Sequence, residues 1–410
     1  MTLQTGICLG LWLFVMASTG IGTWLSLRFL RQRRPRFAAV FERARVEGIE
    51  GFLPPVSVIK PMKSVDDGLR QSLEVFLTQD YPDYELIFCV ASEDDPAFGL
   101  ARDLIEQYPH SKARLLVGEA GVGFNPKVDN LLKGYQQAEH DWILISDSNV
   151  RVGSDYLKKL VSHVGPGVGL VTSPLVGLHS SRFWGHVERI ALNSFVTRWT
   201  LFACALGVPV PSGKVMLFQR SVAEQFGGLS SLANYLAEDF MLADKMRRIG
   251  LKVVLTHEPV VQYVGEQSVF SYWGRHLRWG RLRKAISIYS FISEILINSI
   301  VSGVLGGWVI GRWLGVSAGS FFAFHMSFYL ICDLLLIQEI EGSFVWQDLI
   351  AWCVREASAI PLWLVALCGN KVKWRGKELI VRAQTRLELP GEGSLSEHLE
   401  TSFSMGSGHQ

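Results

Sequence analysis

The sequence has few cysteines and no paired cysteine motif. Its six cysteines are scattered over 410 residues, and none of them forms a C-x-x-C pair. Disulfide scaffolds and zinc sites both need recurrent, closely spaced cysteines, so the sequence argues against either. The pattern fits a reducing compartment. The cysteines are Cys8, Cys89, Cys204, Cys332, Cys353 and Cys368.

Charge is also scarce, in two long stretches. Residues 1–27 contain no charged side chain, and residues 286–368 contain few. The chain as a whole is 49% hydrophobic, and its net charge of +2 says little about partners. Between the two apolar stretches lies a region of ordinary globular composition. The sequence therefore predicts a globular domain flanked by membrane segments.

The first apolar stretch is predicted to be an uncleaved membrane anchor. Residues 6–30 are long enough to cross a hydrocarbon core of about 30 Å. A secretory signal would carry its basic residues before the apolar run, whereas here they follow it. By the positive-inside rule this basic flank is cytoplasmic. The flank contains Arg28, Arg31, Arg33, Arg34 and Arg36.

The second apolar stretch offers three candidate spans, and each of them carries ionisable residues. Such residues inside a span are costly and usually face protein or water. The basic run at 371–377 favours the cytoplasm, and one anchor followed by two crossings returns the chain there. We therefore expect two full crossings and a re-entrant or interfacial third candidate. The candidates are 286–310 with Glu294, 313–337 with Asp333, and 348–368 with Arg355 and Glu356.

The region between the apolar stretches alternates strand and helix patterns. Short apolar runs, typical of buried strands, are separated by segments with helical spacing. Such alternation predicts a parallel sheet covered by helices on both faces. The predicted strands are 56–60, 84–91, 113–119 and 142–147, then 168–177 and 214–220; the predicted helices are 68–79, 97–108, 125–138 and 234–250, and 251–264 is extended.

Polar clusters follow three of the predicted strands. In open α/β sheets, ligands bind beyond the carboxyl ends of the strands. Three strand ends that converge on one edge are better evidence for a binding site than any single cluster. The clusters are Lys60-Pro61, Glu93-Asp94-Asp95 and Asp147-Ser148-Asn149.

The fourth predicted strand lacks an Asp-x-Asp pair at its end. Asp147 is followed by Asn149 in the second position. Mg²⁺ and Mn²⁺ prefer oxygen ligands and are often held by one or two carboxylates plus substrate phosphates. Asp147 is therefore a candidate ligand of a metal-bound diphosphate. The alternative is an ordinary strand-to-turn junction, where Asp, Ser and Asn are common.

Three further positions have a functional and a purely structural interpretation. Asp95 is a candidate contact to a nucleotide base or ribose, or else it forms a turn before a proline. Glu238 and Asp239 lie in an amphipathic stretch, where one carboxylate is a candidate general base. The alternative for this pair is a solvated face or an acidic helix N-terminus. Lys127 either meets a phosphate or is exposed.

A basic cluster with two tryptophans precedes the second apolar stretch. Arginine forks suit bidentate contact with a diphosphate. A juxtamembrane belt that binds anionic lipid is the alternative. Nucleic-acid binding is a poor fit, because the basic residues border a membrane segment. The cluster contains Trp273, Arg275, Arg278, Trp279, Arg281, Arg283 and Lys284.

Taken in chain order, Asp95, Asp147, Glu238-Asp239 and the segment RHLRW at 275–279 resemble the D, D, D, (Q/R)xxRW signature of processive and lipid-directed glycosyltransferases. More narrowly, the chain is similar to the ceramide glucosyltransferase family from the anchor to about Arg375. Hopanoid-modifying glycosyltransferases that use UDP-N-acetylglucosamine share the four-part signature and are the alternative. The segments that carry the resemblance are KPMKSVDDGL, QDYPDYELIFCV, EDDPA, VGFNPKVDNLLKGY, SDSNVRV, LAEDF, RHLRW, REASAIPLW and KVKWRGK.

The resemblance implies a GT-A fold, UDP-glucose as donor, a divalent metal (Mn²⁺ or Mg²⁺) and inversion at the anomeric carbon. It implies that Asp95 contacts the nucleotide, that Asp147 binds the metal and diphosphate, and that Asp239 deprotonates the primary hydroxyl of ceramide. Asn149, where related enzymes often have Asp, leaves the metal's ligand set open. The remaining expected contacts to the nucleotide sugar are Lys60, Lys127, Arg275, Arg278 and Trp279, with Glu238 and Asn149 in support.

The expected partners are the nucleotide sugar, a ceramide-like lipid and a membrane, either a bacterial inner membrane or the cytoplasmic face of the Golgi. A non-enzymatic membrane scaffold and a polysaccharide synthase are the competing functions. The expected organisation is a transmembrane anchor at 1–30, a cytoplasmic GT-A catalytic domain at 31–285, membrane-embedded helices at 286–370, and a basic cytoplasmic tail at 371–410 that is disordered from Leu387 onward.

Overall fold

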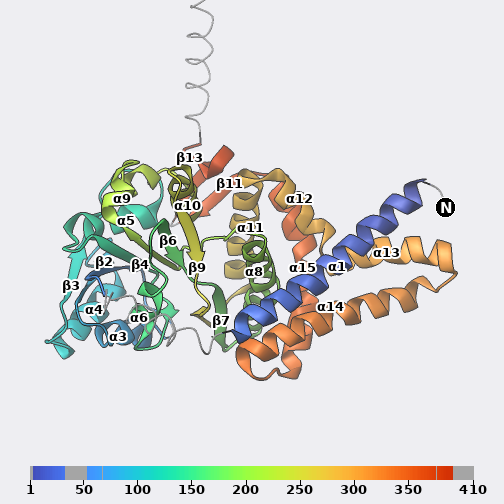
Figure 1. Cartoon of the computed structure of the whole chain (residues 1–410), viewed down its shortest axis with the longest axis horizontal. Coiled ribbons are helices and arrows are strands. Elements are labelled where there is room, and N and C mark those ends of the chain that lie inside the picture. The colour runs from blue at the N-terminus through green and yellow to red at the C-terminus, as the bar shows by residue number, and fades with distance from the viewer. Residues whose placement is uncertain (1–2, 33–52, 67, 375, 391–410) are drawn as a thin grey trace, which may run out of the picture.

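The hydrophilic half of the molecule is built on a seven-stranded sheet (Figure 1). The computed structural model describes residues 3–32, 53–66, 68–374 and 376–390. The strand order is β3-β2-β1-β4-β8-β6-β9. The strands are β1 (Val56–Pro61), β2 (Tyr84–Val90), β3 (Ala113–Val117), β4 (Trp142–Ser146), β6 (Val168–Thr172), β8 (Val215–Gln219) and β9 (Lys252–Leu255).

The sheet is mixed, so the prediction of a parallel sheet is wrong at one strand. Strands β1 to β4 run parallel, and β6 pairs in parallel with β9. Strand β8 runs antiparallel to both of its neighbours, β4 and β6. The apolar pattern of a buried strand does not encode its direction, which depends on the side from which the chain re-enters the sheet. A second sheet joins β5 (Val150–Arg151), β10 (Val260–Gly265) and β7 (Leu175–Ser180).

Helices cover both faces of the large sheet, as the strand and helix alternation predicts. One core packs α3, α4 and α6 onto the sheet, and a second core packs α5, α9 and α10 onto the other face. Strand β4 is buried along its whole length, which explains its apolar run, Trp-Ile-Leu-Ile. The helices are α3 (Leu69–Leu77), α4 (Pro96–Gln107), α5 (Pro126–Gln137), α6 (Tyr156–Val161), α9 (Arg220–Glu224) and α10 (Glu238–Arg248), with a short 3₁₀ turn η2 (Leu229–Leu232).

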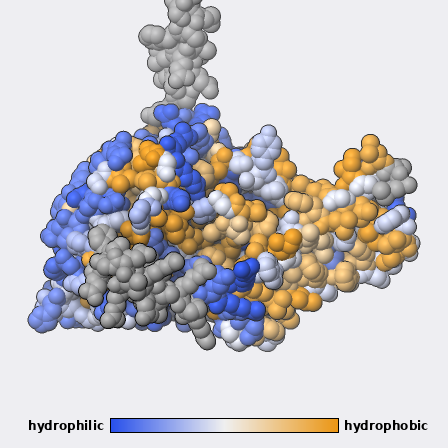
Figure 2. All heavy atoms as spheres, in the orientation of Figure 1, coloured by the Kyte–Doolittle hydropathy of each residue, from blue (hydrophilic) through white to orange (hydrophobic). Residues whose placement is uncertain are grey.

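The other half of the molecule is a group of apolar helices. Figure 2 shows that its surface is largely hydrophobic, whereas the sheet half is hydrophilic. Among the described residues, three helices are long and apolar enough to cross a membrane. They are α1 (Leu3–Arg31), α14 (Ala318–Glu341) and α15 (Trp346–Leu367). The predicted anchor thus coincides with α1; Arg33, Arg34 and Arg36 of its basic flank lie outside the described residues.

The first distal candidate is a broken helix, whereas the third candidate forms the continuous helix α15; this corrects the expectation that the third candidate is the re-entrant one. Its residues form α12 (Ile288–Leu296) and α13 (Ser299–Leu314), which meet at an angle of 63°. The Asn298 side chain caps α13 by accepting hydrogen bonds from Ile300 N and Val301 N. Helices α1, α13 and α14 pack together and extend away from the sheet (Figure 1). Helix α15 packs instead against α7 (Phe183–Ala191) and α11 (Val269–Ile286).

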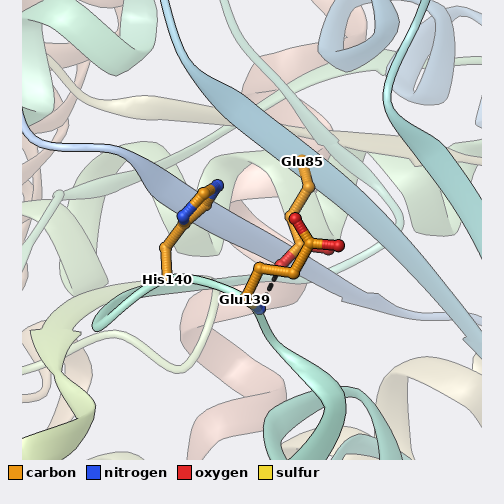
Figure 3. A group of neighbouring side chains, drawn as sticks. All are labelled: Glu85, Glu139 and His140. Carbon is orange, nitrogen blue, oxygen red and sulfur yellow. Dashed lines mark hydrogen bonds between the residues drawn. The ribbon is translucent and has the colours of Figure 1, made fainter.

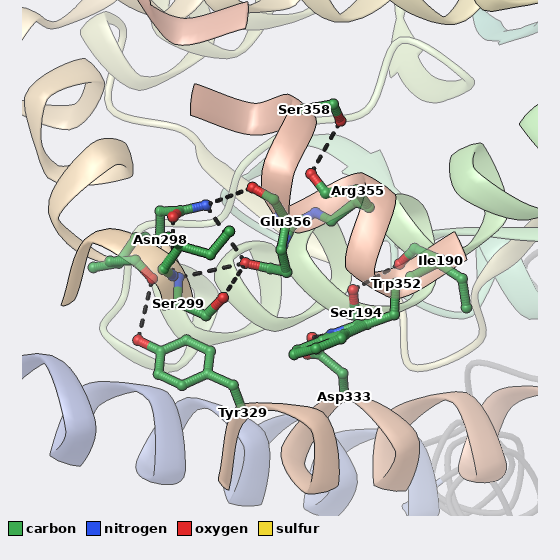
Figure 4. Close-up of polar contacts among 12 residues, drawn as sticks. Ile190, Ser194, Asn298, Ser299, Tyr329, Asp333, Trp352, Arg355, Glu356 and Ser358 are labelled. Carbon is green, nitrogen blue, oxygen red and sulfur yellow. Dashed lines mark hydrogen bonds and ion pairs between the residues drawn. The ribbon is translucent and has the colours of Figure 1, made fainter. Parts of the chain in front are cut away.

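The ionisable residues named in the three candidate spans face protein, as expected. Asp333 of α14 is 1% exposed, pairs with Arg198, and accepts a hydrogen bond from Trp352 Nε1 at 2.7 Å. Glu356 of α15 accepts a hydrogen bond from Ser299 Oγ at 2.6 Å (Figure 4). Because a buried charge is tolerated only with partners, these pairs tie the apolar helices to one another.

Replacing Asp333 with leucine is expected to destabilise the protein by about 3–5 kcal/mol, because it leaves the Arg198 guanidinium buried and unpaired. The measurement is thermal unfolding in detergent. The double variant R198M/D333L removes both charges and should recover most of the lost stability. A double variant that is as unstable as the single one would contradict this assignment.

One segment that the sequence places in the catalytic domain packs on the apolar helices. Helices α7 (Phe183–Ala191) and α8 (Thr197–Ala205) are joined by a π-helical turn, η1 (Leu192–Val196). Helix α7 packs on α15, α8 on α1, and η1 on α14. Part of the region predicted as the catalytic domain, 31–285, thus packs on the apolar helices. The mixed composition of this segment gives no sign of that packing in the sequence, because its polar residues form ion pairs with the distal helices.

The region after α15 is folded up to Glu388, which corrects the prediction of disorder from Leu387. Strands β11 (Lys371–Trp374), β12 (Lys377–Val381) and β13 (Leu387–Glu388) form an antiparallel sheet with a short turn, η3 (Ala383–Thr385). Its apolar residues pack on Leu236, just before α10. Disorder was expected from Leu387, yet Leu387 is buried; residues 391–410 lie outside the described chain.

Candidate active site

Asp147 lies at the carboxyl end of β4 between two lysines. Its Oδ1 is 2.8 Å from Lys127 Nζ, and its Oδ2 is 3.0 Å from Lys214 Nζ. Burial by itself raises the pKa of Asp147, but the two ammonium groups outweigh burial and hold that pKa well below its usual value. Asp147 is therefore a carboxylate at neutral pH, as a ligand of a cation must be.

Lys127 links Asp147 to the acidic pair of α10. The side chain of Asn125 caps α5, and Pro126 occupies the first turn, so Lys127 projects from the start of that helix. Its Nζ is 2.9 Å from Glu238 Oε1 and donates to Gly213 O at 2.7 Å. Although burial lowers the pKa of Lys127, the two carboxylates raise it above its usual value. The exposed alternative for Lys127 is wrong, because it is largely buried within an ion-pair network.

Glu238 and Asp239 occupy the first turn of α10, but their surroundings differ. Glu238 is 6% exposed and paired with Lys127, whereas Asp239 is partly exposed. Burial and the neighbouring Glu238 charge raise the pKa of Asp239 to about 6. A carboxylate with this pKa is a suitable general base near neutral pH. A side chain at Gly213 would place its Cβ 3.1 Å from Asp239 Oδ2, so glycine there leaves room beside the carboxylate.

Lys60 lies beneath this cluster. It is fully buried in β1 and donates to Ser146 Oγ at 3.1 Å and to Asp147 O at 3.0 Å. Its Nζ also lies 3.8 Å from the centre of the Phe76 ring. Burial lowers the pKa of Lys60 to about 7. The structure thus places Lys60 as a support of the turn that carries Asp147.

Asp95 lies beyond the carboxyl end of β2, two strands from β4, and caps α4. Its Oδ1 accepts hydrogen bonds from Ser64 N at 2.7 Å and from Ala97 N at 3.0 Å. The turn interpretation of Asp95 therefore describes its local structure. This does not conflict with a nucleotide contact, because Asp95 remains partly exposed at the same sheet edge.

Lys214 was missed by the sequence analysis. Its Nζ lies between Asp147 Oδ2 and Asn149 Oδ1, at 3.0 and 2.9 Å. Lys214 immediately precedes β8, and because β8 is antiparallel, its start lies at the edge where β4 ends. Read as a parallel strand, β8 would carry Lys214 to the opposite edge. The strand pattern alone therefore does not indicate that Lys214 lies beside Asp147.

The three signature residues of α11 (Val269–Ile286) do not share one environment. Arg275 Nη1 bonds Glu188 Oε1 at 2.8 Å, and the Arg278 guanidinium stacks over Trp374 at 5.5 Å from the ring centre. Burial lowers the pKa of Arg278 and so does the Arg275 charge, whereas the Glu238 carboxylate raises it, so Arg278 lies within electrostatic range of Glu238. Trp279 lines a cavity among the apolar helices.

The cavity lies among helices of the apolar half. Its empty space, including the open mouth, is about 880 Å³. Helix α11 lies between the sheet and the apolar helices (Figure 1), and its residues on the cavity side include His276 and Trp279. More than half of the lining is apolar or aromatic, and Figure 4 shows three of its polar residues, Asn298, Arg355 and Glu356. The other charged lining residues are Arg198, Arg283 and Glu294. Other lining residues are Phe195, Tyr272, Phe291, Leu362 and Trp363.

A second acidic group lies at the wrong sheet edge for this site. Glu85, Glu139 and His140 are close enough to share a metal ion (Figure 3). They stand at the amino ends of β2 and β4, opposite Asp147. Glu85 already pairs with Arg114 at 2.8 Å and accepts the Glu139 N–H at 2.6 Å, so the group is explained as a structural ion pair.

The sequence profile of glycosyl transferase family 21 matches residues 11–387, nearly the whole chain. The chain belongs to glycosyl transferase family 21. It is 29% identical over 332 residues to ceramide glucosyltransferase 1 of Caenorhabditis elegans, covering 80% of this chain and 71% of that protein. It is 25% identical over 432 residues to the ceramide glucosyltransferase of Komagataella phaffii, covering 81% and 83%.

Among solved structures, the chain is similar to a mannosyltransferase from Pyrobaculum calidifontis that was determined in complex with GDP-Man and Mn²⁺. The TM-score is 0.50 at 17% identity, covering 89% of this chain and 99% of that one. At this identity the likeness shows the fold alone. It confirms the predicted GT-A fold, and membership of family 21 confirms that the protein is a glycosyltransferase enzyme, not a scaffold.

In this family 21 enzyme, the C-terminal sheet contributes to the site through two contacts that the sequence analysis missed. The ring of Trp374, in β11, stacks against the Arg278 guanidinium. Leu236, two residues before Glu238, donates its N–H to Thr385 O at 2.8 Å. Arg281 and Lys284 of α11 donate to backbone carbonyls around the start of β11. The basic cluster of α11 is thus partly internal to the fold.

Replacing Arg278 with lysine is expected to lower kcat/KM by about 10- to 100-fold, because lysine loses the planar fork that stacks on Trp374 and that is expected to bond a diphosphate. The measurement is steady-state transfer in detergent. Arg312→Lys is the matched control, because Arg312 also stacks on a tryptophan, Trp308, at 5.0 Å. If Arg278→Lys matches the wild type, the basic cluster only anchors the protein to lipid.

Proposed function

We propose that this enzyme transfers glucose from UDP-glucose to the primary hydroxyl of ceramide, with inversion at the anomeric carbon. The observation that carries the proposal is that α11 separates a charged cluster at the sheet edge from a largely apolar cavity among the membrane-type helices. The names of the two relatives, both ceramide glucosyltransferases, support the same substrates.

The physical chemistry of the substrates explains this arrangement. Each methylene of a lipid chain that leaves an apolar environment costs about 0.8 kcal/mol, so ceramide stays in the bilayer. A charged nucleotide sugar stays in water. An enzyme that joins them has to hold a water-facing donor site against a lipid-facing acceptor site. We assign the sheet edge to the donor and the cavity to the acceptor, with the sheet domain in the cytoplasm.

Asp239 is assigned as the general base. It is partly exposed, beside Gly213, and its raised pKa makes it a better proton acceptor than an ordinary carboxylate. Removing the proton from the ceramide hydroxyl lets the oxygen attack the anomeric carbon from the face opposite the leaving diphosphate, which gives inversion. Glu238 stays paired with Lys127 and serves as support.

The diphosphate is assigned to Asp147 and the cationic groups around it. Arg278 lies within electrostatic range of Glu238 and offers a planar guanidinium to phosphate oxygens. Lys127 is held by Asp147 and Glu238 and supplies fixed positive charge there. Asp95, beyond the carboxyl end of β2, is assigned to the nucleoside.

A divalent cation fits between Asp147 and Asn149, because the Lys214 ammonium already occupies that position, bound to one oxygen of each. Both are the oxygen ligands that Mg²⁺ and Mn²⁺ prefer. When bound, the ion supplies charge stabilisation to the departing diphosphate. Asp147 and Asn149 would hold the ion, and Lys214 would be released from them.

Product analysis with purified protein in detergent tests the proposal. One reaction contains ceramide and UDP-glucose; the rival reaction contains a hopanoid polyol and UDP-N-acetylglucosamine; each is run with and without Mn²⁺ or Mg²⁺. Glucosylceramide is the expected product, as one added sugar and not a ladder. Product from the rival pair alone would overturn the proposed substrates while keeping the fold, and a ladder would indicate a polysaccharide synthase.

A further inference from the structure

Glu188 is a buried carboxylate on α7 that the proposed reaction does not use. Its exposed fraction is 0%. A charge so deep in a protein is tolerated only when partners satisfy it. Both partners are residues of α11: Arg275 Nη1 donates to Oε1 at 2.8 Å, and His276 Nε2 donates to Oε2 at 2.8 Å.

Arg275 and His276 are consecutive in the helix, so their side chains leave it about 100° apart. A single carboxylate reaches both only when it lies over the helix between them and gives one oxygen to each. The two bonds therefore fix the rotation of α11 about its axis at this point. Burial raises the pKa of Glu188, but His276 and Arg275 outweigh it and hold that pKa at about 2.

The two partners face different substrates. Arg275 is the first residue of the RHLRW segment and one of the residues expected to contact the nucleotide sugar, and its charge acts on that of Lys214, which bonds Asp147. His276 lines the cavity assigned to the acceptor, where its ring lies 4.2 Å from that of Tyr272 and 5.2 Å from that of Trp279. Glu188 thus touches one residue from each side of α11.

Helix α7 is itself held by the apolar helices. Arg189, the residue after Glu188, pairs with Glu341 at the end of α14 and with Asp348 in the first turn of α15. The side chains of these two acids are 10% and 1% exposed. The position of Glu188 is therefore set by the membrane-type helices, and Glu188 in turn sets α11.

We infer that Glu188 is a positioning residue that holds Arg275 for the donor diphosphate and His276 for the lipid acceptor at once. The inference rests on the proposed function, because it uses the donor and acceptor sides assigned there. It predicts that loss of the Glu188 charge disturbs both substrates together, although Glu188 touches neither of them.

The test compares Glu188→Gln with single changes at its partners in steady-state transfer, with each substrate varied in turn. Glu188→Gln is expected to raise KM for both UDP-glucose and ceramide by about tenfold, because a charged hydrogen bond to each partner is lost. Arg275→Lys should raise KM mainly for UDP-glucose, and His276→Asn mainly for ceramide. In Glu188→Gln, either partner change should then add much less than it does in the wild type.

Glu85→Gln is the matched control, because Glu85 is also a buried carboxylate paired with an arginine, but at the opposite sheet edge. It should lower Tm without changing either KM. If Glu188→Gln fails to fold, Glu188→Asp replaces it in the test. This variant keeps the charge on a side chain shorter by one methylene, and a smaller rise is expected in both KM values. Unchanged KM values in a folded Glu188 variant would overturn the inference and leave a structural ion pair.

The wild-type reaction distinguishes this failure from failure of the proposed function. No glucosylceramide from the wild type would overturn the proposed function. Titration with UDP would still decide the donor half of the inference. Glu188→Gln is expected to weaken UDP binding about tenfold, as Arg275→Lys does, and UDP binding equal to the wild type would overturn that half.

Discussion

Asp239→Asn is expected to lower the rate of glucose transfer by about 10²- to 10⁴-fold, the usual contribution of a positioned general base. Asparagine keeps the size of the side chain and can still accept the Phe240 N–H, which Asp239 Oδ1 accepts at 2.7 Å. Local structure should therefore persist, and only the proton acceptor is removed. UDP-glucose binding, measured by titration calorimetry, should stay close to that of the wild type.

Asp244→Asn is the control for this change. Asp244 lies in the same helix, α10, but pairs with Arg248 at the surface. Surface pairs of this kind contribute about 0–1 kcal/mol, so the variant should transfer glucose normally. Full activity in purified Asp239→Asn would remove Asp239 as the base and make Glu238 the carboxylate to examine.

The pH dependence of transfer provides a second measurement on Asp239. A base has to be deprotonated to act, and the pKa of this carboxyl is raised to about 6. The rate should therefore be constant above that pH and fall as the pH drops through about 6, by tenfold per pH unit. The residual activity of Asp239→Asn should lack this acidic limb. An unchanged limb in that variant would assign the titration to another group.

Asp147→Ala is expected to lower transfer by about 10³-fold or more, because it removes the group assigned to the cation and leaves the diphosphate without that charge stabilisation. The structure adds a second cost, since Lys127 and Lys214 both lose the carboxylate that they share. Added Mn²⁺ should stimulate the wild type and should not restore the variant. Transfer and Mn²⁺ binding are measured on the same preparation.

Asp141→Asn separates loss of the site from loss of the strand. Asp141 lies just before the other end of β4, where it accepts hydrogen bonds from Ser221 N and Oγ, both at 2.8 Å. This variant should lower Tm while the folded protein keeps its response to Mn²⁺. Stimulation of Asp147→Ala by Mn²⁺ would contradict the assignment of the end of β4 as the cation site.

The sequence by itself determined the alternating core and the edge on which the site lies. Buried strands and covering helices have distinct apolar periods, so these periods alone were enough to place β1 to β4 and their helices along the chain. Because the carboxyl ends of parallel strands meet at one edge, Asp95 and Asp147 could be assigned to that edge. The order of acidic residues followed by RHLRW likewise identified the family that the profile confirms.

The tertiary structure alone decided which residues surround these carboxylates. Lys214 joins Asp147 because β8 runs antiparallel, Glu188 joins Arg275 because α7 packs on the apolar helices, and Trp374 joins Arg278 because the chain after α15 folds back as a sheet. Apolar periodicity records only whether a position is buried. An ion pair between distant segments depends on strand direction and packing, which are properties of the whole fold.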